Sequence, residues 1–307
     1  MIKQAQHRME TSGERLDRFL LHRYPWLDRP TIHQLIAAGH IRLEGPHARR
    51  AAKGTRLAAG DTLTLRDIPE PEDLQPRANP DLPLAVAYED EVLLAFSKPA
   101  GQPTHPLRHD ETGTLVNAML ARYPQLAAIG ESPLFPALLH RLDTQTSGLV
   151  LAAKTPGAYA ALRGQFRRFL VEKHYTALVH GRVDTPGRLE APLMHQTRTP
   201  CKMAVVRSSA AVAASEQFAA ATAWKPLQTG VAQTLLDVTI FTGVTHQIRA
   251  HLAHIGHPIV GDALYGSPAA NAPRHWLHAS RVHLCHPAHG KSMILQAPLP
   301  DDWPPCP

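Results

Sequence analysis

A short proline-rich segment limits how this chain can fold. The 307-residue sequence has five prolines between Pro69 and Pro83, in the stretch "PEPEDLQPRANPDLP". Because proline fixes φ and has no backbone N–H to donate, such a stretch favours an extended connection over a helix or a central strand. The chain is also long enough to build two cores. We therefore predict an acidic linker over residues 69–83, with a small unit before it, residues 1–68, and a larger unit after it, residues 84–307.

Basic residues are concentrated in the small N-terminal unit. The whole chain has a formal net charge of +6 and a pI near 9.4. Residues 1–68 hold 12 Lys and Arg against 7 Asp and Glu, whereas residues 69–83 hold 1 against 4. A locally basic surface favours a polyanionic partner, although a basic helical face can also be merely solvated.

Several classes of protein are disfavoured by the sequence. It has no run of about 18 apolar residues that could span a bilayer. The N-terminal stretch "MIKQAQHRMETSGERLDRF" lacks the apolar region and cleavage site of a signal peptide. Cys201, Cys285 and Cys306 are far apart and without Cys-x-x-Cys spacing, which fits reduced thiols better than a disulfide framework or a zinc ribbon. We expect a cytoplasmic protein that does not bind membranes.

The small unit has the pattern of a compact α+β domain. In "ERLDRFLLHRY", Leu16, Phe19 and Leu20 have the i, i+3, i+4 spacing of an amphipathic helix. The segment "RPTIHQLIAAGH" predicts a second helix, which Gly39 ends. Two short strands are expected to follow, residues 41–43 and 62–65.

The larger unit mixes strands and helices without a regular βαβ alternation. Thr155 is a candidate N-cap with Pro156 at the first helical position. "QTLLDVTIF" alternates as a half-buried strand does, and "THQIRAHLAHIGHP" has the spacing of a helix. Consecutive strands of this kind favour an α+β domain with a mostly antiparallel, mixed sheet.

The stretch "HRLDTQTSGLVLAAK" contains the first candidate for chemistry. Asp143 lies in the loop that leads into an apolar strand, Leu149–Ala153. In one interpretation its carboxylate makes an Asx turn and accepts from the amides of Gln145 and Thr146. In the other, a loop bordering a rigid strand presents a reactive carboxylate. The residues alone leave both open.

Arg249 is the second candidate. On the helix predicted for "THQIRAHL" it lies about 100° from the stripe of Ile248, Leu252 and Ile255. At the border of the buried face its guanidinium can reach into a cleft, where Asp143 would be a suitable anion and would stay charged. Otherwise Arg249 is a solvated helix residue.

Histidines are frequent, 20 in all, and four lie close together: His246, His251, His254 and His257. Two of these have i, i+3 spacing on the predicted helix, which raises the possibility of a metal site and of a histidine-rich metalloenzyme. Since no carboxylate or cysteine completes a set of ligands, we expect no metal.

Four segments, in order, resemble the RluA-type pseudouridine synthases. They are "YEDEVLLAFSKPAGQPTHP", "HRLDTQTSGLVLAAK", "EKHYTALVHG" and "TGVTHQIRAHLAHIGHPIVGDALYG". The resemblance implies the α+β pseudouridine synthase fold, and an isomerase that converts uridine in RNA to pseudouridine without a cofactor. One departure is Val244, where family members commonly have arginine.

The resemblance also implies roles for individual residues. Asp143 would be the catalytic nucleophile and Arg249 its ion-pair partner, while Tyr175 would stack on the target base and handle a proton. The target uridine must be flipped out of its stack, and Arg141 would fill the vacated space. Further substrate-binding positions are implied at Lys98, His140, Thr146, His246 and Gln247.

The N-terminal segment "GERLDRFLLHRYPWLDRPTIHQLIAAGHIRLEG" resembles the small RNA-binding domain named after ribosomal small-subunit protein four. It departs from that domain at Leu43-Glu44-Gly45, where Val-Asn-Gly is usual. The second helix and the loop after it would present basic residues to structured RNA, namely Arg29, Arg49, Arg50, Lys53 and Arg56. This attached domain is typical of enzymes acting on large-subunit ribosomal RNA, which is the expected partner. Transfer RNA as the substrate, and a catalytically silent ribosome-associated RNA-binding protein, are the alternatives.

Overall fold

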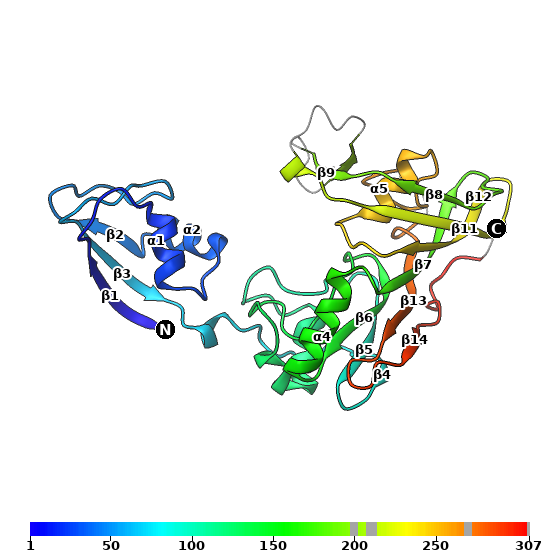
Figure 1. The fold of residues 1–307 in the computed structure, drawn as a ribbon, viewed down its shortest axis with the longest axis horizontal. Coiled ribbons are helices and arrows are strands. Elements are labelled where there is room, and N and C mark those ends of the chain that lie inside the picture. The colour runs from blue at the N-terminus through cyan, green and yellow to red at the C-terminus, as the bar shows by residue number, and fades with distance from the viewer. Residues whose placement is uncertain (197–201, 207–213, 267–271, 306–307) are drawn as a thin grey trace. The chain divides into compact units, whose positions relative to one another are not determined.

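The computed structural model describes residues 1–196, 202–206, 214–266 and 272–305, and divides into two compact units, Met1–Gln75 and Pro76–Pro307 (Figure 1). The division falls inside the predicted linker. Of the three cysteines, Cys285 is a free thiol, while Cys201 and Cys306 lie outside the described residues. No helix in the described ranges is long and apolar enough to cross a membrane.

The N-terminal unit packs two helices on a three-stranded antiparallel sheet of order β1-β3-β2. Both predicted helices and both predicted strands are confirmed, although the strands are longer than predicted. Leu16, Leu20 and Ile32 are fully buried and form its core with residues of β3. The mostly polar strand β1 was not predicted, because it is an edge strand with few buried positions. The elements are β1 (Ile2–Arg8), α1 (Leu16–Arg23), α2 (Arg29–Ala37), β2 (Ile41–Glu44) and β3 (Thr62–Ile68).

The predicted linker is packed at both of its ends. A 3-10 helix, η1 (Pro71–Leu74), follows the sheet, and Leu74 is buried in the core of the N-terminal unit. On the far side, the amide nitrogen of Asn79 donates to the carbonyl of Asn117, and the Asn117 side chain donates to the carbonyl of Arg77. Residues 69–83 are therefore not extended throughout, since prolines also suit the first turn of a helix.

The larger unit is built on one mixed sheet. In the described part of the chain this sheet has nine strands, in the order β4-β5-β6-β13-β7-β12-β11-β8, with β14 also paired to β13. Every pairing is antiparallel except β6 with β13, as expected for the α+β class. The strands are β4 (Val86–Glu89), β5 (Leu93–Lys98), β6 (Ser147–Ala153), β7 (Glu172–His180), β8 (Gly187–Glu190), β11 (Ala221–Thr229), β12 (Gln233–Ile240), β13 (Leu277–Cys285) and β14 (Ser292–Gln296).

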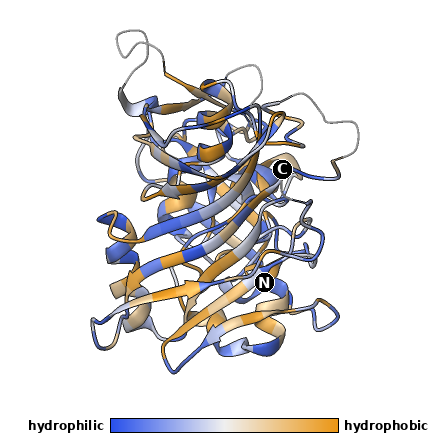
Figure 2. Cartoon of the chain, turned by 90° about the vertical axis from the view of Figure 1, so that its right-hand side faces the viewer, coloured by the Kyte–Doolittle hydropathy of each residue, from blue (hydrophilic) through white to orange (hydrophobic). Residues whose placement is uncertain are grey.

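Short helices and a small hairpin complete this unit. Thr155 caps α4 as predicted, since its hydroxyl accepts a hydrogen bond from the amide of Ala158. Hydrophobic and hydrophilic residues are interspersed along strands of the sheet (Figure 2), as expected for strands that have only one side against a core, such as β12. The remaining elements are α3 (Leu115–Arg122), η2 (Pro124–Ala128), α4 (Pro156–Arg167), β9 (Leu193–His195), β10 (Met203–Val205), η4 (Ala214–Glu216) and α5 (Gln247–His254).

Gly148 explains part of the Thr-Ser-Gly sequence that follows the loop of Asp143. Its φ is +111°, and a Cβ atom built on it would lie 2.3 Å from the carbonyl oxygen of Ala279 in β13. A side chain at this position would therefore separate β6 from β13. All seven residues of β6 are buried, so the loop that carries Asp143 is anchored to the centre of the sheet.

Candidate active site

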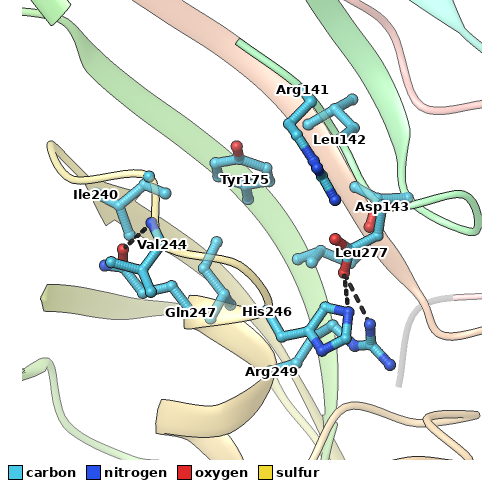
Figure 3. Close-up of a pocket in the computed structure, with 13 residues that line it drawn as sticks. Arg141, Leu142, Asp143, Tyr175, Ile240, Val244, His246, Gln247, Arg249 and Leu277 are labelled. Carbon is cyan, nitrogen blue, oxygen red and sulfur yellow. Dashed lines mark hydrogen bonds and ion pairs between the residues drawn. The ribbon is translucent and has the colours of Figure 1, made fainter. Parts of the chain in front are cut away.

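Asp143, Tyr175 and Arg249 line one pocket, although they come from three different elements (Figure 3). Asp143 lies in the loop before β6, Tyr175 on β7 and Arg249 on α5. Strand β13 lies between β6 and β7 and pairs with both. The central strands of the sheet thus bring the three side chains together. Arg141, Thr146, His246 and Gln247 also line this pocket.

A chain of two ion pairs runs through the pocket wall. Arg249 donates from Nη1 to Asp143 Oδ2 at 2.7 Å. Its Nε and Nη2 donate to the two carboxylate oxygens of Asp262 at 2.7 and 2.9 Å. Burial alone would lower the pKa of Arg249, but the bond to Asp262 and the nearby Asp143 raise it above its usual value. The guanidinium is therefore charged and fixed in orientation.

The Asp143 carboxylate faces α5 and does not make an Asx turn. The amide of Thr146 donates to the backbone oxygen of Asp143 at 3.0 Å, while the carboxylate pairs with Arg249. The side chain of Asp143 keeps 20% exposure, against 9% for Arg249 and none for Asp262. Of the three charged groups in these two ion pairs, the Asp143 carboxylate is thus the most open to a ligand.

His246 lies beside the Asp143 carboxylate. Its Nε2 is 3.7 Å from Asp143 Oδ2, and its Nδ1 is 3.2 Å from the hydroxyl of Tyr265. Burial lowers the pKa of His246, and the neighbouring Asp143 opposes that shift only in part. A neutral imidazole at this position can exchange a hydrogen bond with a substrate without competing with Arg249 for Asp143.

Tyr175 and Arg141 border the same open space as Asp143 (Figure 3). Tyr175 is 7% exposed, and burial followed by the nearby Asp143 raises the pKa of its phenol. Its hydroxyl therefore stays protonated at neutral pH. Arg141 is exposed, so its planar guanidinium is available to a ligand.

Lys98 holds the loop that carries Asp143 and does not line the pocket. It is 1% exposed, and its ammonium donates to the carbonyls of Pro99, Gln102 and Thr144 at 2.8, 2.7 and 3.1 Å. Burial lowers the pKa of Lys98 to about 7, although Asp143 opposes the shift. Since an ammonium has three protons to donate, Lys98 joins the two loops and is fully used within the protein.

The side chains of Gln247 and Thr146 make hydrogen bonds within the wall of the pocket. The side-chain oxygen of Gln247 accepts from the hydroxyl of Thr242 and the amide of Val244, at 2.8 and 3.2 Å. Thr146 Oγ1 lies 2.8 Å from Nε2 of His275, whose pKa burial lowers to about 4. Val244, at the position where the resemblance leads one to expect arginine, packs against a small apolar cluster.

His140 lies next to the pocket and not in its lining. Its Nε2 accepts a hydrogen bond from the amide of Leu151 at 3.1 Å, and its ring stacks on Phe166 with 5.3 Å between centroids. Burial lowers the pKa of His140 to about 3. The neutral ring thus completes the hydrogen bonding of β6.

Of the other three histidines of this cluster, His254 is exposed, whereas His251 and His257 bond to backbone and hydroxyl groups. His251 is fully buried, with Nδ1 2.8 Å from the Thr222 hydroxyl and Nε2 3.0 Å from the carbonyl of Ala191. His257 Nδ1 lies 3.0 Å from the carbonyl of His180. Among the described residues, no group of three or more His, Cys, Asp or Glu side chains is placed to hold a metal ion.

Asp262, Tyr265 and His275 were not predicted as site residues. Asp262 and Tyr265 belong to the Gly-Asp-x-x-Tyr segment, so that motif was the available signal. The Arg249 guanidinium lies 5.2 Å from the centroid of the Tyr265 ring. His275 has no local signal, because its contact with Thr146 depends on the pairing of distant strands.

The predicted basic residues of the N-terminal unit are all on its surface. Arg29 is the first residue of α2 and is exposed, as are Arg49, Arg50, Lys53 and Arg56 in the loop after β2. Arg49 donates to the carbonyl of His47 at 2.9 Å, which orders part of this loop. Arg49 and Arg50 line a shallow hollow beside α2 and β2.

Comparisons with known proteins give a consistent result. The family profile described as RNA pseudouridylate synthase matches residues 92–254. An uncharacterized RNA pseudouridine synthase of Chloroflexus aurantiacus is 40% identical over 95% of this chain and 88% of its own length. Proteins named ribosomal large subunit pseudouridine synthase D are 34% identical in Xanthomonas campestris, over 98% of this chain and 90% of theirs, and in Pseudomonas aeruginosa, over 96% and 91%.

Solved structures agree on the pseudouridine synthase fold. The human RNA pseudouridylate synthase domain containing 1 aligns with a TM-score of 0.57 and 23% identity, over 71% of this chain and 84% of that one. The human domain containing 4 aligns with a TM-score of 0.54 and 24% identity, over 71% and 89%.

Proposed function

Because the chain belongs to the RNA pseudouridylate synthase family, whose members are isomerases, we propose that it converts specific uridines of large-subunit ribosomal RNA to pseudouridine, with Asp143 as the nucleophile. The observation that carries the role of Asp143 is its 2.7 Å contact with Arg249 in a pocket that Tyr175 also lines. A partly exposed carboxylate, held by a buried guanidinium, is suited to attack a bound nucleotide.

The chemistry needs few groups. The glycosidic bond from the ribose to N1 of the base breaks and a bond from the ribose to C5 forms, while a proton leaves C5 and N1 gains one. No electron is lost and no phosphate is transferred. Asp143 attacks either the sugar or the base of the flipped nucleotide. Tyr175 stacks on that base, and its protonated phenol takes part in the proton transfer.

The target base must leave its stack to reach Asp143. Flipping a nucleotide out of a helix costs a few kcal/mol. In the proposal, the exposed Arg141 fills the vacated space, because a planar guanidinium stacks well on bases. Thr146, His246 and Gln247 hold the walls of the pocket, Lys98 supports the loop that carries Asp143, and His140 holds strand β6, so that the open space keeps its shape.

The choice of ribosomal RNA rests on the relatives and on the N-terminal unit. Relatives named for the large ribosomal subunit match this chain over nearly its whole length. The exposed Arg29, Arg49, Arg50, Lys53 and Arg56 fit the phosphates of structured RNA, as in the domain of ribosomal small-subunit protein four. The enzyme would act on this RNA in the cytoplasm and would need no cofactor.

The alternative of a silent RNA-binding protein has less support. A protein without catalytic activity has no need to hold a carboxylate, a charged guanidinium and a neutral tyrosine around one open space. Transfer RNA is the second candidate for the substrate, since the pocket itself recognises a single flipped nucleotide.

The test is to map pseudouridines in ribosomal and transfer RNA from cells with and without this gene. Sites in large-subunit RNA that disappear with the gene, and return with the wild-type chain but not with Asp143→Asn, are the expected result. Loss confined to transfer RNA would identify transfer RNA as the substrate, and restoration by Asp143→Asn would reject the role of Asp143.

A further inference from the structure

A second hollow adjoins the Asp143 pocket. Arg141, Tyr175 and Gly243 line both, so the two hollows are neighbours that share part of one wall. The walls of the second hollow come from the loop before β6, from α4 and the turn after it, from β7, and from the loop after β12. We call it the flanking groove and define it by the residues that matter here, Arg141, Arg163, Arg167, Phe169, Lys173 and Phe241.

Four cationic side chains, and no carboxylate among the described residues, line the flanking groove. Within the described residues, no carboxylate forms an ion pair with Arg141, Arg163, Arg167 or Lys173. Arginine and lysine near an enzyme pocket are usually neutralised by Asp or Glu or are fully solvated. Arg163 and Lys173 are neither paired with a carboxylate nor fully solvated.

Arg163 has an unused donor inside the protein. Its Nη1 donates to the carbonyl of Leu139 at 3.3 Å, but its Nε is buried and has no hydrogen-bond partner among the described residues. Buried donors are normally paired, because an unpaired donor has lost its water without replacement. Arg163 also lines the groove and makes only the one bond to Leu139 among the described residues, so its guanidinium has further N–H groups to offer a ligand there.

Lys173 is a buried ammonium with spare donors. It is 5% exposed, and the carbonyl of Thr242, at 2.7 Å, is its one hydrogen-bond acceptor in the described structure. A Cβ atom built on Gly243 would lie 3.4 Å from the Lys173 Nζ, so the ammonium reaches the junction of the two hollows. Burial lowers the pKa of Lys173 to about 8, which leaves it mostly charged at neutral pH.

Two exposed aromatic rings border these cations. Phe169 and Phe241 are 54% and 43% exposed. Phe169 follows the C-cap of α4 with φ at +56°, the left-handed conformation that glycine usually supplies after a helix. A bulky residue is strained there. The chain thus keeps a phenylalanine where its own folding would favour glycine, which points to a role for the exposed ring.

We propose that Arg163 and Lys173 bind the phosphodiester of the nucleotide next to the target uridine, and that Phe169 and Phe241 stack on that nucleotide's base. The inference rests on the proposed function, because the flipped uridine occupies the pocket that shares Arg141 and Tyr175 with the groove. The nucleotide covalently joined to it is then the nearest source of an anion. Exposed aromatic rings beside cations are the usual platform for single-stranded nucleotides.

Arg163 and Lys173 are positioning residues in this account. They do not touch the reacting atoms, but by holding a neighbouring phosphate they fix the backbone on one side of the flipped uridine. Correct placement of a reactant is itself a large part of catalysis. Loss of these cations should therefore lower kcat/KM for RNA without changing which uridine reacts.

The test is a scan of neutral linkages along the substrate RNA. A set of oligonucleotides carries one methylphosphonate in place of one phosphate, at successive positions around the uridine that the mapping identifies, in whichever RNA it lies. Failure of the ribosomal assignment thus changes the oligonucleotide and leaves this test intact. Each member is assayed with the wild-type enzyme, with Arg163→Gln, with Lys173→Met and with Arg182→Gln, an exposed control paired with Asp184.

One adjacent linkage should be sensitive in the wild type, with kcat/KM reduced about ten-fold when it is neutral. Arg163→Gln and Lys173→Met should already have a low kcat/KM for the unmodified RNA. Neutralising the same linkage should therefore lower their kcat/KM by less than about two-fold. Arg182→Gln should behave as the wild type. If no adjacent linkage is sensitive in the wild type, or if it is equally sensitive in both variants, the phosphate site is refuted, whatever the stability of the variants.

Phe169→Gly tests the stacking separately. Glycine relieves the left-handed strain, so thermal stability should not fall. Affinity for the RNA should nevertheless fall about ten-fold, because a base loses its aromatic partner. Unchanged affinity would overturn the role of this ring. Tight binding of an acidic peptide to the groove, in place of sensitivity to a linkage, would instead identify a protein partner and reject the nucleotide.

Discussion

Asp262 and Asp143 bind different atoms of the same guanidinium. Asp262 occupies Nε and Nη2 of Arg249, which leaves Nη1 to Asp143. Asp262 is fully buried and also accepts from the amides of Leu264 and Tyr265 at 3.0 and 3.2 Å. Burial would raise the pKa of Asp262, but the bond from Arg249 lowers it overall. Asp262 thus sets the orientation in which Arg249 meets Asp143.

Asp262→Asn should therefore impair both stability and activity. The change leaves a buried guanidinium without half of its neutralising charge, and breaking a buried ion pair costs about 3 kcal/mol or more. Urea unfolding measures that loss. Asp184→Asn removes an exposed partner of Arg182 and should cost less than about 1 kcal/mol. Equal costs for the two variants would show that Asp262 does not hold Arg249.

Stability should fall in mild acid because of buried histidines. Burial lowers the pKa of His140 to about 3, and those of His105 and His275 to about 4. Below pH 6.5 the unfolded chain binds protons that these rings do not bind when folded, so the free energy of unfolding decreases as the pH drops from 6.5 toward 4. Each histidine contributes up to about 1.4 kcal/mol per pH unit.

The contribution of His140 can be isolated by His140→Gln, whose amide oxygen can still accept from Leu151. The slope of unfolding free energy against pH should become shallower in this variant between pH 6.5 and 4. His109→Gln, at an exposed position, should keep the wild-type slope. An unchanged slope in His140→Gln would mean that the ring is protonated in the folded protein.

Arg49 and Arg50 test whether the N-terminal unit grips RNA. Both are exposed in the loop after β2. Replacing both by Ala should weaken binding to the substrate RNA and reduce the slope of log affinity against log salt by about two units, one for each lost phosphate contact. Arg182→Ala serves as the control. If the slope stays the same while affinity changes, these residues do not contact the backbone.

Much of this arrangement was predictable from sequence, and the reason differs between elements. Helices α1, α2 and α5 have regular apolar spacing or clear end signals, and Thr155 caps α4 as its neighbours indicate. The position of Arg249 at the border of a buried helix face left its pairing with Asp143 as one of two interpretations; the family resemblance implied the pair, and the structure contains it.

The rest depends on contacts that no local pattern encodes. The polar edge strand β1 has too few buried positions to give a period. Lys98 was assigned to the substrate by resemblance, whereas its three carbonyl partners come from two loops that meet only in the fold. The lack of a hydrogen-bond partner for the buried Nε of Arg163 among the described residues, and the left-handed backbone conformation of Phe169, likewise arise only in the tertiary structure.

The central claim is that the Asp143 carboxylate performs the reaction, and Asp143→Asn tests it most directly. The amide keeps the size of the side chain but removes its charge, so single-turnover formation of pseudouridine should fall at least roughly a thousand-fold, while RNA affinity stays within about three-fold of the wild type. Asp301→Asn, at an exposed position, should react normally. Substantial turnover by Asp143→Asn on the same RNA would contradict the account.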